Sequence, residues 1–196
     1  EKGLIEALDY DQIDDAGAYP RAPEPASLYR MHGNLSGAYK VKNIRCRNRV
    51  VLTNKTPSGL NRGFGGPQHY FALERLVHQI AVEINLNVLD VIKVNLLEKK
   101  QFPYKSPSGA LLDSGDFQKL VKKVVKSSTY KNILKKKNDA IKNGKIYGIG
   151  YSAIIEPSIS NMGYVTTALP YKDREKTGHK GGALASTSVS IGPTGS

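Results

Sequence analysis

The chain has 196 residues, 39% of them hydrophobic, and a formal net charge of +12, a balance that suits a globular protein with one substantial core or two small ones and disfavours disorder. No apolar run approaches the roughly 18 residues of a membrane-spanning helix, and no charged-then-apolar leader opens the chain, so we expect a cytoplasmic protein without a membrane partner. The single cysteine, Cys46, excludes an internal disulfide and an iron–sulfur cluster, which needs about four thiolates.

Two strands are predicted in the first part of the chain. Leu4 to Asp14 alternates apolar and polar residues, and Asn43 to Thr53 has apolar residues at strand spacing. Between them, the prolines of Ala18 to Ala26 cannot continue a strand, so we expect a loop or a helix entry there.

A glycine-rich stretch follows, from Asn61 to Gln68. Glycines next to a helix N-terminus let backbone N–H groups come close to a bound anion or cofactor. By spacing alone the stretch is neither a Rossmann fingerprint nor a P-loop, because the third glycine, the later acidic residue and the Lys-Ser/Thr ending are missing. The spacing alone therefore points only to a ligand-binding loop.

Helical periodicity begins directly after this stretch. The predicted buried stripe consists of Leu73, Leu76, Val77, Ile80 and Ile84. Glu74, Gln79 and Glu83 are expected to lie mostly off the stripe, and a second short helix is expected from about Asp90 to Leu97.

Turn-forming residues make Lys99 to Ser114 the best candidate for a domain junction. After it, apolar residues alternate with lysines at helical spacing, which predicts a pair of amphipathic helices with a solvated basic face, closed by Asn143-Gly144. Aromatic residues that would stack on bases are sparse here, so we expect no specific nucleic-acid partner. The lysines are Lys119, Lys122, Lys123, Lys126, Lys131, Lys135, Lys136, Lys137, Lys142 and Lys145.

The last part of the chain contains two further predicted strands, Ile146 to Ile155 and Ala183 to Ile191. Ser158 to Gly182, between them, is long, polar and poorly patterned, and we expect a mobile loop.

As a literal string, Arg-Gly-Phe-Gly-Gly-Pro-Gln at residues 62–68 resembles the cofactor loop in the large subunit of the molybdenum hydroxylases, the xanthine dehydrogenase and aldehyde oxidase family. Residues 38–45 resemble the strand that leads into this loop, and residues 71–84 resemble the helix that follows it. Further downstream the resemblance includes Phe102–Tyr104, Asp113–Phe117, Tyr147–Gly150 and Glu156–Ser158, so it covers most of the chain.

The resemblance implies an α+β fold in which mixed sheets pack with helices, spanning the end of one cofactor-binding domain and the start of the next. Residues 1–98 would be the C-terminal part of the first molybdopterin-binding domain, and residues 99–196 the N-terminal part of the second. The family's other cofactor loops and its catalytic glutamate have no counterpart here. We therefore expect an internal fragment, excised or encoded as a split subunit, with no catalytic residue, no bound cofactor and no turnover in isolation.

The same resemblance implies that the loop contacts the molybdenum–molybdopterin cofactor through Arg62, Gly63, Gly65 and Gly66. The guanidinium fork of Arg62 suits an anionic group. Phe64 would project over the substrate, where its ring positions a planar molecule. The alternatives are a surface arginine at the helix start and a core phenylalanine.

Further substrate contacts are implied at Arg30, Ser160 and Asn161. Arg30 precedes Tyr39 by nine residues, the spacing at which xanthine-oxidising relatives place a substrate-binding arginine, although a structural arginine is an equal alternative. Ser160 and Asn161 lie where relatives line the substrate funnel. The histidines have no metal-ligand spacing, so we expect no metal site made by protein side chains.

The implied function is part of a molybdenum hydroxylase that oxidises an aldehyde or an N-heterocycle with water as the oxygen source. Electrons would pass to iron–sulfur and FAD subunits, in a hetero-oligomer that also contains the remainder of the large subunit. The resemblance disfavours carbon monoxide, because relatives that oxidise it have a cysteine where this chain has Gly63. Asn61 replaces the aromatic residue usually found before the arginine, a departure that concerns how the oxo or sulfido face of the cofactor is packed. A polyanion- or nucleic-acid-binding module and a cofactor-free interaction subunit remain alternatives.

Overall fold

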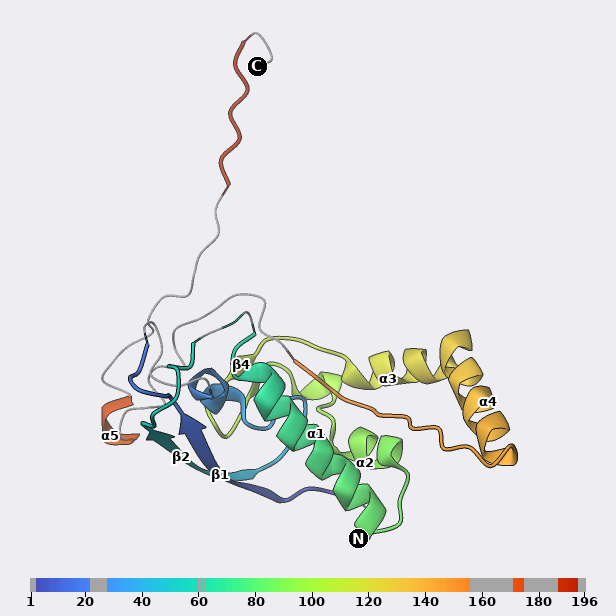
Figure 1. The fold of residues 1–196 in the computed structure, drawn as a ribbon. Helices are drawn as coiled ribbons and strands as arrows, with labels where there is room; N and C mark the ends of the chain where they lie inside the picture. The colour runs from blue at the N-terminus through green and yellow to red at the C-terminus, as the bar shows by residue number, and fades with distance from the viewer. Residues whose placement is uncertain are drawn as a thin grey trace. The chain divides into compact units, whose positions relative to one another are not determined.

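A computed structural model of the chain describes residues 3–21, 28–59, 61, 63–155, 171–174 and 187–193. The chain divides into two compact units, Glu1–Glu156 and Pro157–Ser196. In the second unit the described residues comprise the short helix α5 (Tyr171–Arg174) and residues 187–193, which form no strand. The rest of the predicted loop and strand in this unit lies outside the described residues, and the first unit contains the other elements (Figure 1).

A two-stranded parallel sheet forms the first layer of this unit. Strand β1 (Ala7–Asp15) pairs with β2 (Asn43–Val51), close to the bounds that alternation predicts. The strands are parallel, so the chain crosses over between them, through residues that include the 3-10 helix η1 (Tyr29–Asn34). Alternate residues of β1, Leu8 and Tyr10, are buried in the core.

The other face of the sheet carries paired charges. Acidic residues of β1 stand opposite arginines of β2: Asp9 binds Arg45, and Asp11 lies within ion-pair distance of Arg47 and Arg49. Exposed pairs of this kind contribute little to stability individually. They nevertheless favour the observed register, because a slip of one residue would turn these charges toward the core.

Two helices pack on the buried side of the strands. Helix α1 (Gly66–Glu83) contacts α2 (Val88–Asn95), and the side chain of Asn87 caps α2 by accepting a hydrogen bond from the Leu89 amide. Both helices were predicted, with bounds within a few residues. The core has its largest fully buried residues on these helices and on the flanking chain: Tyr39, Leu73, Leu96, Leu97, His69, Val41, Val77 and Val91.

The predicted stripe of α1 is wrong at three positions. Leu76 and Ile84 are 39% and 44% exposed, whereas Glu74, expected off the stripe, is 6% exposed. The reason is tertiary: the chain segment 151–155 covers the side of α1 that carries Glu74, so the buried face is rotated toward it.

Residues 99–112 form a folded connection. A 3-10 turn, η2 (Lys99–Gln101), is followed by a small antiparallel hairpin of β3 (Tyr104–Lys105) and β4 (Leu111–Leu112). The hairpin is tied to the carbonyl of Gly33 by the Ala110 amide at 2.8 Å and by the Ser108 hydroxyl at 2.9 Å. A domain boundary between residues 98 and 99 stays a prediction.

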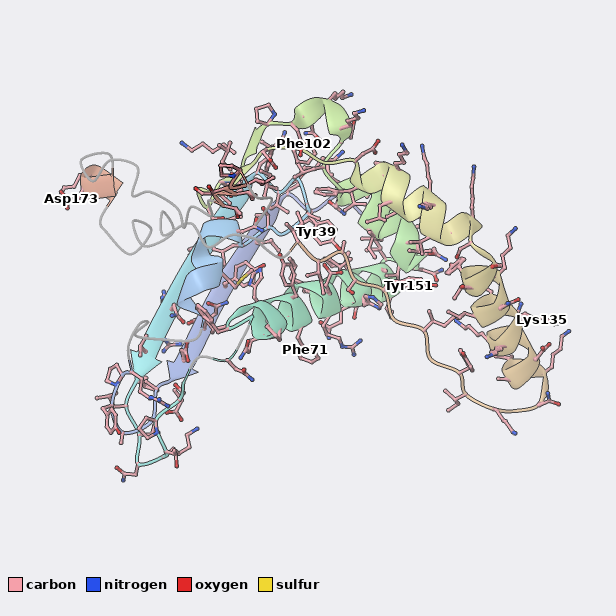
Figure 2. All side chains as sticks on the ribbon, turned by 90° about the horizontal axis from the view of Figure 1, so that it is seen from above. Tyr39, Phe71, Phe102, Lys135, Tyr151 and Asp173 are labelled. Carbon is pink, nitrogen blue, oxygen red and sulfur yellow. The ribbon has the colours of Figure 1, made fainter. Side chains whose placement is uncertain are left out.

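The basic helix pair is confirmed as α3 (Phe117–Lys126) and α4 (Ser128–Lys142). Asp116 and Ser127 cap their N-termini, and Gly144, with φ of 67°, ends α4 as the Asn143-Gly144 signal predicts. Figure 1 shows the pair reaching away from α1, and in Figure 2 Lys135 lies at its far end. Within the described ranges, no helix combines the length and apolar character needed to cross a membrane.

The segment Ile146–Ile155 is not a strand, although its sequence predicts one. It returns from α4 toward α1 as irregular chain (Figure 1). No backbone ladder forms because its neighbours in the described structure are helices, whose backbone groups are already hydrogen-bonded internally. The α+β fold class is confirmed, and the described residues form one parallel and one antiparallel sheet.

Candidate functional site

The glycine-rich stretch forms a tight turn that leads directly into α1. The Phe64 amide donates to the Asn61 carbonyl at 2.8 Å, and the Gly66 amide donates to the Gly63 carbonyl at 2.9 Å. Gly65 is the N-cap residue of the helix, and its carbonyl accepts from the His69 amide at 3.0 Å. Local hydrogen bonds thus fix the backbone of the turn.

Glycine is required in this turn for its backbone conformation. Gly63 and Gly65 have φ of 81° and 78°, a region that side chains with a Cβ adopt at a cost. A Cβ at Gly63 would meet no atom within 4 Å, so the described structure leaves the backbone open on that side. An open, preformed backbone turn at a helix N-terminus can accept an anionic group of a cofactor.

Aromatic residues lie close behind the turn. His69 and Tyr70, in the first turn of α1, are buried, and their ring centroids are 5.4 Å apart. The Tyr10 ring lies 5.5 Å from His69, and its hydroxyl donates to the Leu35 carbonyl at 2.9 Å. Phe64 itself is half-buried at the edge of the turn. The first turn of α1, which directly follows the loop, is therefore anchored in the core.

The structure describes part of the predicted site. It places Gly63, Phe64, Gly65 and Gly66 together in one turn. Arg62, Ser160 and Asn161 lie outside the described residues. Arg30 belongs to η1, which packs against α1, but its side chain lies outside what the structure describes.

A row of polar side chains on α1, Tyr70, Glu74 and His78, was not predicted from the sequence. The carboxylate of Glu74 accepts hydrogen bonds from the Tyr39 hydroxyl, at 3.0 and 2.9 Å to its two oxygens, and from the backbone of Ala153. Burial raises the pKa of Glu74 although these bonds oppose the rise, and burial beside Glu74 raises the pKa of Tyr39. The signal in the sequence was the spacing of Tyr70, Glu74 and His78, four residues apart on one helix face.

A second feature is an apolar groove of about 470 Å³ between α2, α3 and residues 150–155. Its walls include Ile92, Leu96 and Val121, and its polar edge is made by the hydroxyls of Tyr130 and Tyr151, 3.2 Å apart. No cluster of three metal-ligating side chains is found among the described residues. The groove thus offers no charged or ligating group for catalysis.

Comparison with known proteins gives a consistent result. A family model described as a molybdopterin cofactor-binding domain matches residues 1–96. The carbon monoxide dehydrogenase large chain of Hydrogenophaga pseudoflava is 30% identical over 65% of this chain and 16% of its own length. The corresponding protein of Afipia carboxidovorans is 27% identical over 99% of this chain and 24% of its own length.

Solved structures agree in fold. Quinoline 2-oxidoreductase from Pseudomonas putida 86 superposes with a TM-score of 0.63 and 26% identity, over 73% of this chain and 18% of that one. An aldehyde oxidoreductase from Desulfovibrio desulfuricans has a TM-score of 0.60 at 21% identity over 70% of this chain and 14% of that one, which shows similarity of fold alone. The chain therefore spans less than a quarter of the length of these relatives.

Proposed function

The chain belongs to the molybdenum hydroxylase family, and from this premise we propose that it contributes part of the cofactor and substrate pocket of a large subunit. The enzyme would oxidise an aldehyde or an N-heterocycle with water as the oxygen source. The observation that carries the proposal is the glycine turn of residues 63–66 at the start of α1, open on the Gly63 side.

The residues present fit a molybdenum–molybdopterin cofactor. The Gly66 amide already donates to the Gly63 carbonyl, so Gly63 and Gly65 would bring the bare backbone to the helix N-terminus, where an anionic oxygen is favoured by the helix dipole. Arg62, next in sequence, adds a planar guanidinium fork for a phosphate or an oxygen ligand. When bound, the cofactor supplies the centre that accepts two electrons from the substrate carbon.

The chain's own residues would bind and orient the substrate. Phe64, at the edge of the turn, offers a ring face to a planar substrate. Arg30 would stabilise negative charge on a substrate oxygen, and Ser160 and Asn161 would donate or accept hydrogen bonds at the entrance. As the resemblance implies, Gly63 in place of a cysteine would disfavour carbon monoxide as the substrate.

The remaining parts of the proposed enzyme lie beyond this chain. Its single Cys46 cannot hold an iron–sulfur cluster, so electrons would leave through iron–sulfur and FAD subunits of a cytoplasmic hetero-oligomer. Relatives are named as large chains or large subunits, which supports such an assembly. Residues 1–98 and 99–196 would belong to successive molybdopterin-binding domains.

The test compares the complete enzyme with the isolated chain. The assembled enzyme should contain molybdenum and reduce a dye in the presence of an aldehyde or an N-heterocycle. The isolated 196-residue chain should do neither, because the catalytic glutamate and the other cofactor loops are supplied elsewhere. Stoichiometric molybdenum with turnover in the isolated chain, or no molybdenum in the assembled enzyme, would refute the proposal.

A further inference from the structure

The glycine turn and the segment 151–155 are connected through one face of α1. Tyr70, Glu74 and His78 follow each other at intervals of four residues on this helix. Such residues lie one above the other, about 6 Å apart along the axis. All three side chains point to the backbone of the same neighbouring segment.

The two outer contacts set the direction of that segment. The Tyr70 hydroxyl donates to the Ile155 carbonyl and accepts from the Ile155 amide, at 3.3 Å for the latter. Eight residues further along α1, Nε2 of His78 lies 2.8 Å from the Tyr151 carbonyl oxygen. The Tyr151 amide lies 3.3 Å from the same nitrogen. A protonated Nε2 donates to the Tyr151 carbonyl, and an unprotonated Nε2 accepts from the Tyr151 amide, so either tautomer bonds to the backbone of Tyr151. The segment therefore runs antiparallel to the helix.

The middle contact is the buried one. The carboxylate of Glu74 accepts from the backbone of Ala153, halfway between the outer contacts, and is held from the other side by the Tyr39 hydroxyl. Because the Tyr39 hydroxyl fixes the Glu74 carboxylate, the Ala153 amide can form its hydrogen bond in only one position along α1.

The spacing of the contacts explains how residues 151–155 can bond to side chains of a helix instead of to the backbone of a neighbouring strand. Two residues of extended chain advance about 6.6 Å, close to the 6 Å of four helical residues. Alternate residues thus meet successive turns of α1, while Ser152 and Ile154 between them are exposed. A slip by one residue would turn the bonded amides and carbonyls away from the helix and lose every contact.

We infer that Tyr70, Glu74 and His78, here termed the side-chain clamp, are positioning residues that hold residues 151–155 on α1 in a single register. The effect of the clamp on the substrate pocket rests on the proposed function. The clamp begins one turn after the glycine turn and ends at Ile155, next to the point where the chain continues toward Ser160 and Asn161. It would therefore fix that exit point relative to the cofactor loop.

Amide hydrogen exchange of the purified enzyme tests the clamp directly. Tyr70→Phe and His78→Phe keep the rings and remove the bonding groups, so exchange in residues 151–155 should accelerate about fivefold in each. His78→Gln, whose amide can donate to the same carbonyl, should restore much of the protection. Exchange in α2 serves as the internal reference for global stability.

Matched controls separate the clamp from general effects of the substitutions. Tyr104→Phe removes a half-buried hydroxyl from β3, and Glu83→Gln neutralises an exposed carboxylate at the end of α1. Neither should alter exchange in residues 151–155. Unchanged exchange in Tyr70→Phe and His78→Phe, or equal acceleration in the controls, would overturn the clamp.

Steady-state kinetics test the positioning role. Tyr70→Phe should raise KM for the substrate while the molybdenum content stays at the parent level, because phenylalanine keeps the ring behind the cofactor loop and loses only the hydroxyl that bonds to Ile155. Faster exchange with unchanged KM would overturn the assignment as positioning residues. Arg62→Ala, which probes the proposed function, should leave exchange in residues 151–155 unchanged, so failure of the clamp and failure of the cofactor site are distinguishable.

Discussion

The glycine turn at the start of α1 and the lysine-rich pair α3–α4 are the two regions of this chain that suggest a ligand, and they differ in how they are built. In the turn, local hydrogen bonds fix the backbone conformations of Gly63 and Gly65, and the turn leads into a helix whose first turn carries the buried side chains of His69 and Tyr70. The lysines of α3 and α4 are on an open surface, and none lies within ion-pair distance of a carboxylate in the described part of the chain.

A high density of charge therefore does not by itself indicate a ligand-binding site. A solvated lysine keeps its hydration and its freedom, so it attracts any anion weakly. A backbone turn held in one conformation binds without further ordering and can select by shape. Substitutions in the two regions should therefore differ in their effects on stability and activity.

The largest difference is expected in stability. Leu73 on α1 is fully buried, whereas Leu120 on α3 is 60% exposed. Leu73→Ala should lower the free energy of unfolding by about 3 to 4 kcal/mol, because it leaves a cavity in the core. Leu120→Ala should cost less than about 1 kcal/mol. Urea denaturation measures both, and similar losses would mean that α3 is packed as tightly as α1.

Activity should separate the regions next. In the complete enzyme, we expect Arg62→Ala to remove the proposed cofactor contact and to cost on the order of 3 kcal/mol, roughly a hundredfold in rate. Lys136→Ala removes the same charge from an exposed helix and should leave the rate near that of the parent. Steady-state rates and molybdenum content of both variants are compared. Full activity and metal loading in Arg62→Ala would remove the glycine turn from the active site.

A smaller effect concerns Glu74. Its pKa is raised above the ordinary 4.5 by burial, so the unfolded chain loses this proton first as pH rises. The stability due to the protonated form is present below pH 4.5 and is lost as pH rises through the native pKa. Glu74→Gln should flatten this part of the profile and exposed Glu83→Gln should not, in denaturation curves measured between about pH 4 and 8. An identical slope in parent and Glu74→Gln would contradict the raised pKa.

The smallest effect is expected from the lysines as a polyanion site. An oligonucleotide should bind weakly, without sequence preference, and should dissociate by about 0.3 M salt, because counterion release is the only driving force. Fluorescence anisotropy at increasing salt measures this. A complex that survives such salt with a clear sequence preference would favour the nucleic-acid-binding alternative over the solvated-face interpretation.

Local patterns in the sequence predicted most helices and strands of the first unit correctly, but not the irregular segment Ile146–Ile155. Alternation placed β1 and β2, helical periodicity placed α1, α3 and α4, and the Asn143-Gly144 signal placed the end of α4. These patterns depend on neighbours within a few positions, so they can be read without the fold. The literal string at residues 62–68 resembles the cofactor loop of the molybdenum hydroxylases, and a molybdopterin cofactor-binding domain model matches residues 1–96.

Which polar and apolar residues of α1 are buried depends on the tertiary structure. Glu74 is buried and Leu76 exposed because the segment 151–155, more than seventy residues away, lies on one side of α1. Ile146–Ile155 has the composition of a strand. Its residues 151–155 nevertheless hydrogen-bond to side chains of α1, because a helix and not a strand lies beside them. Periodicity gives the relative angle of residues around a helix, whereas the side that is covered depends on which distant segment packs there.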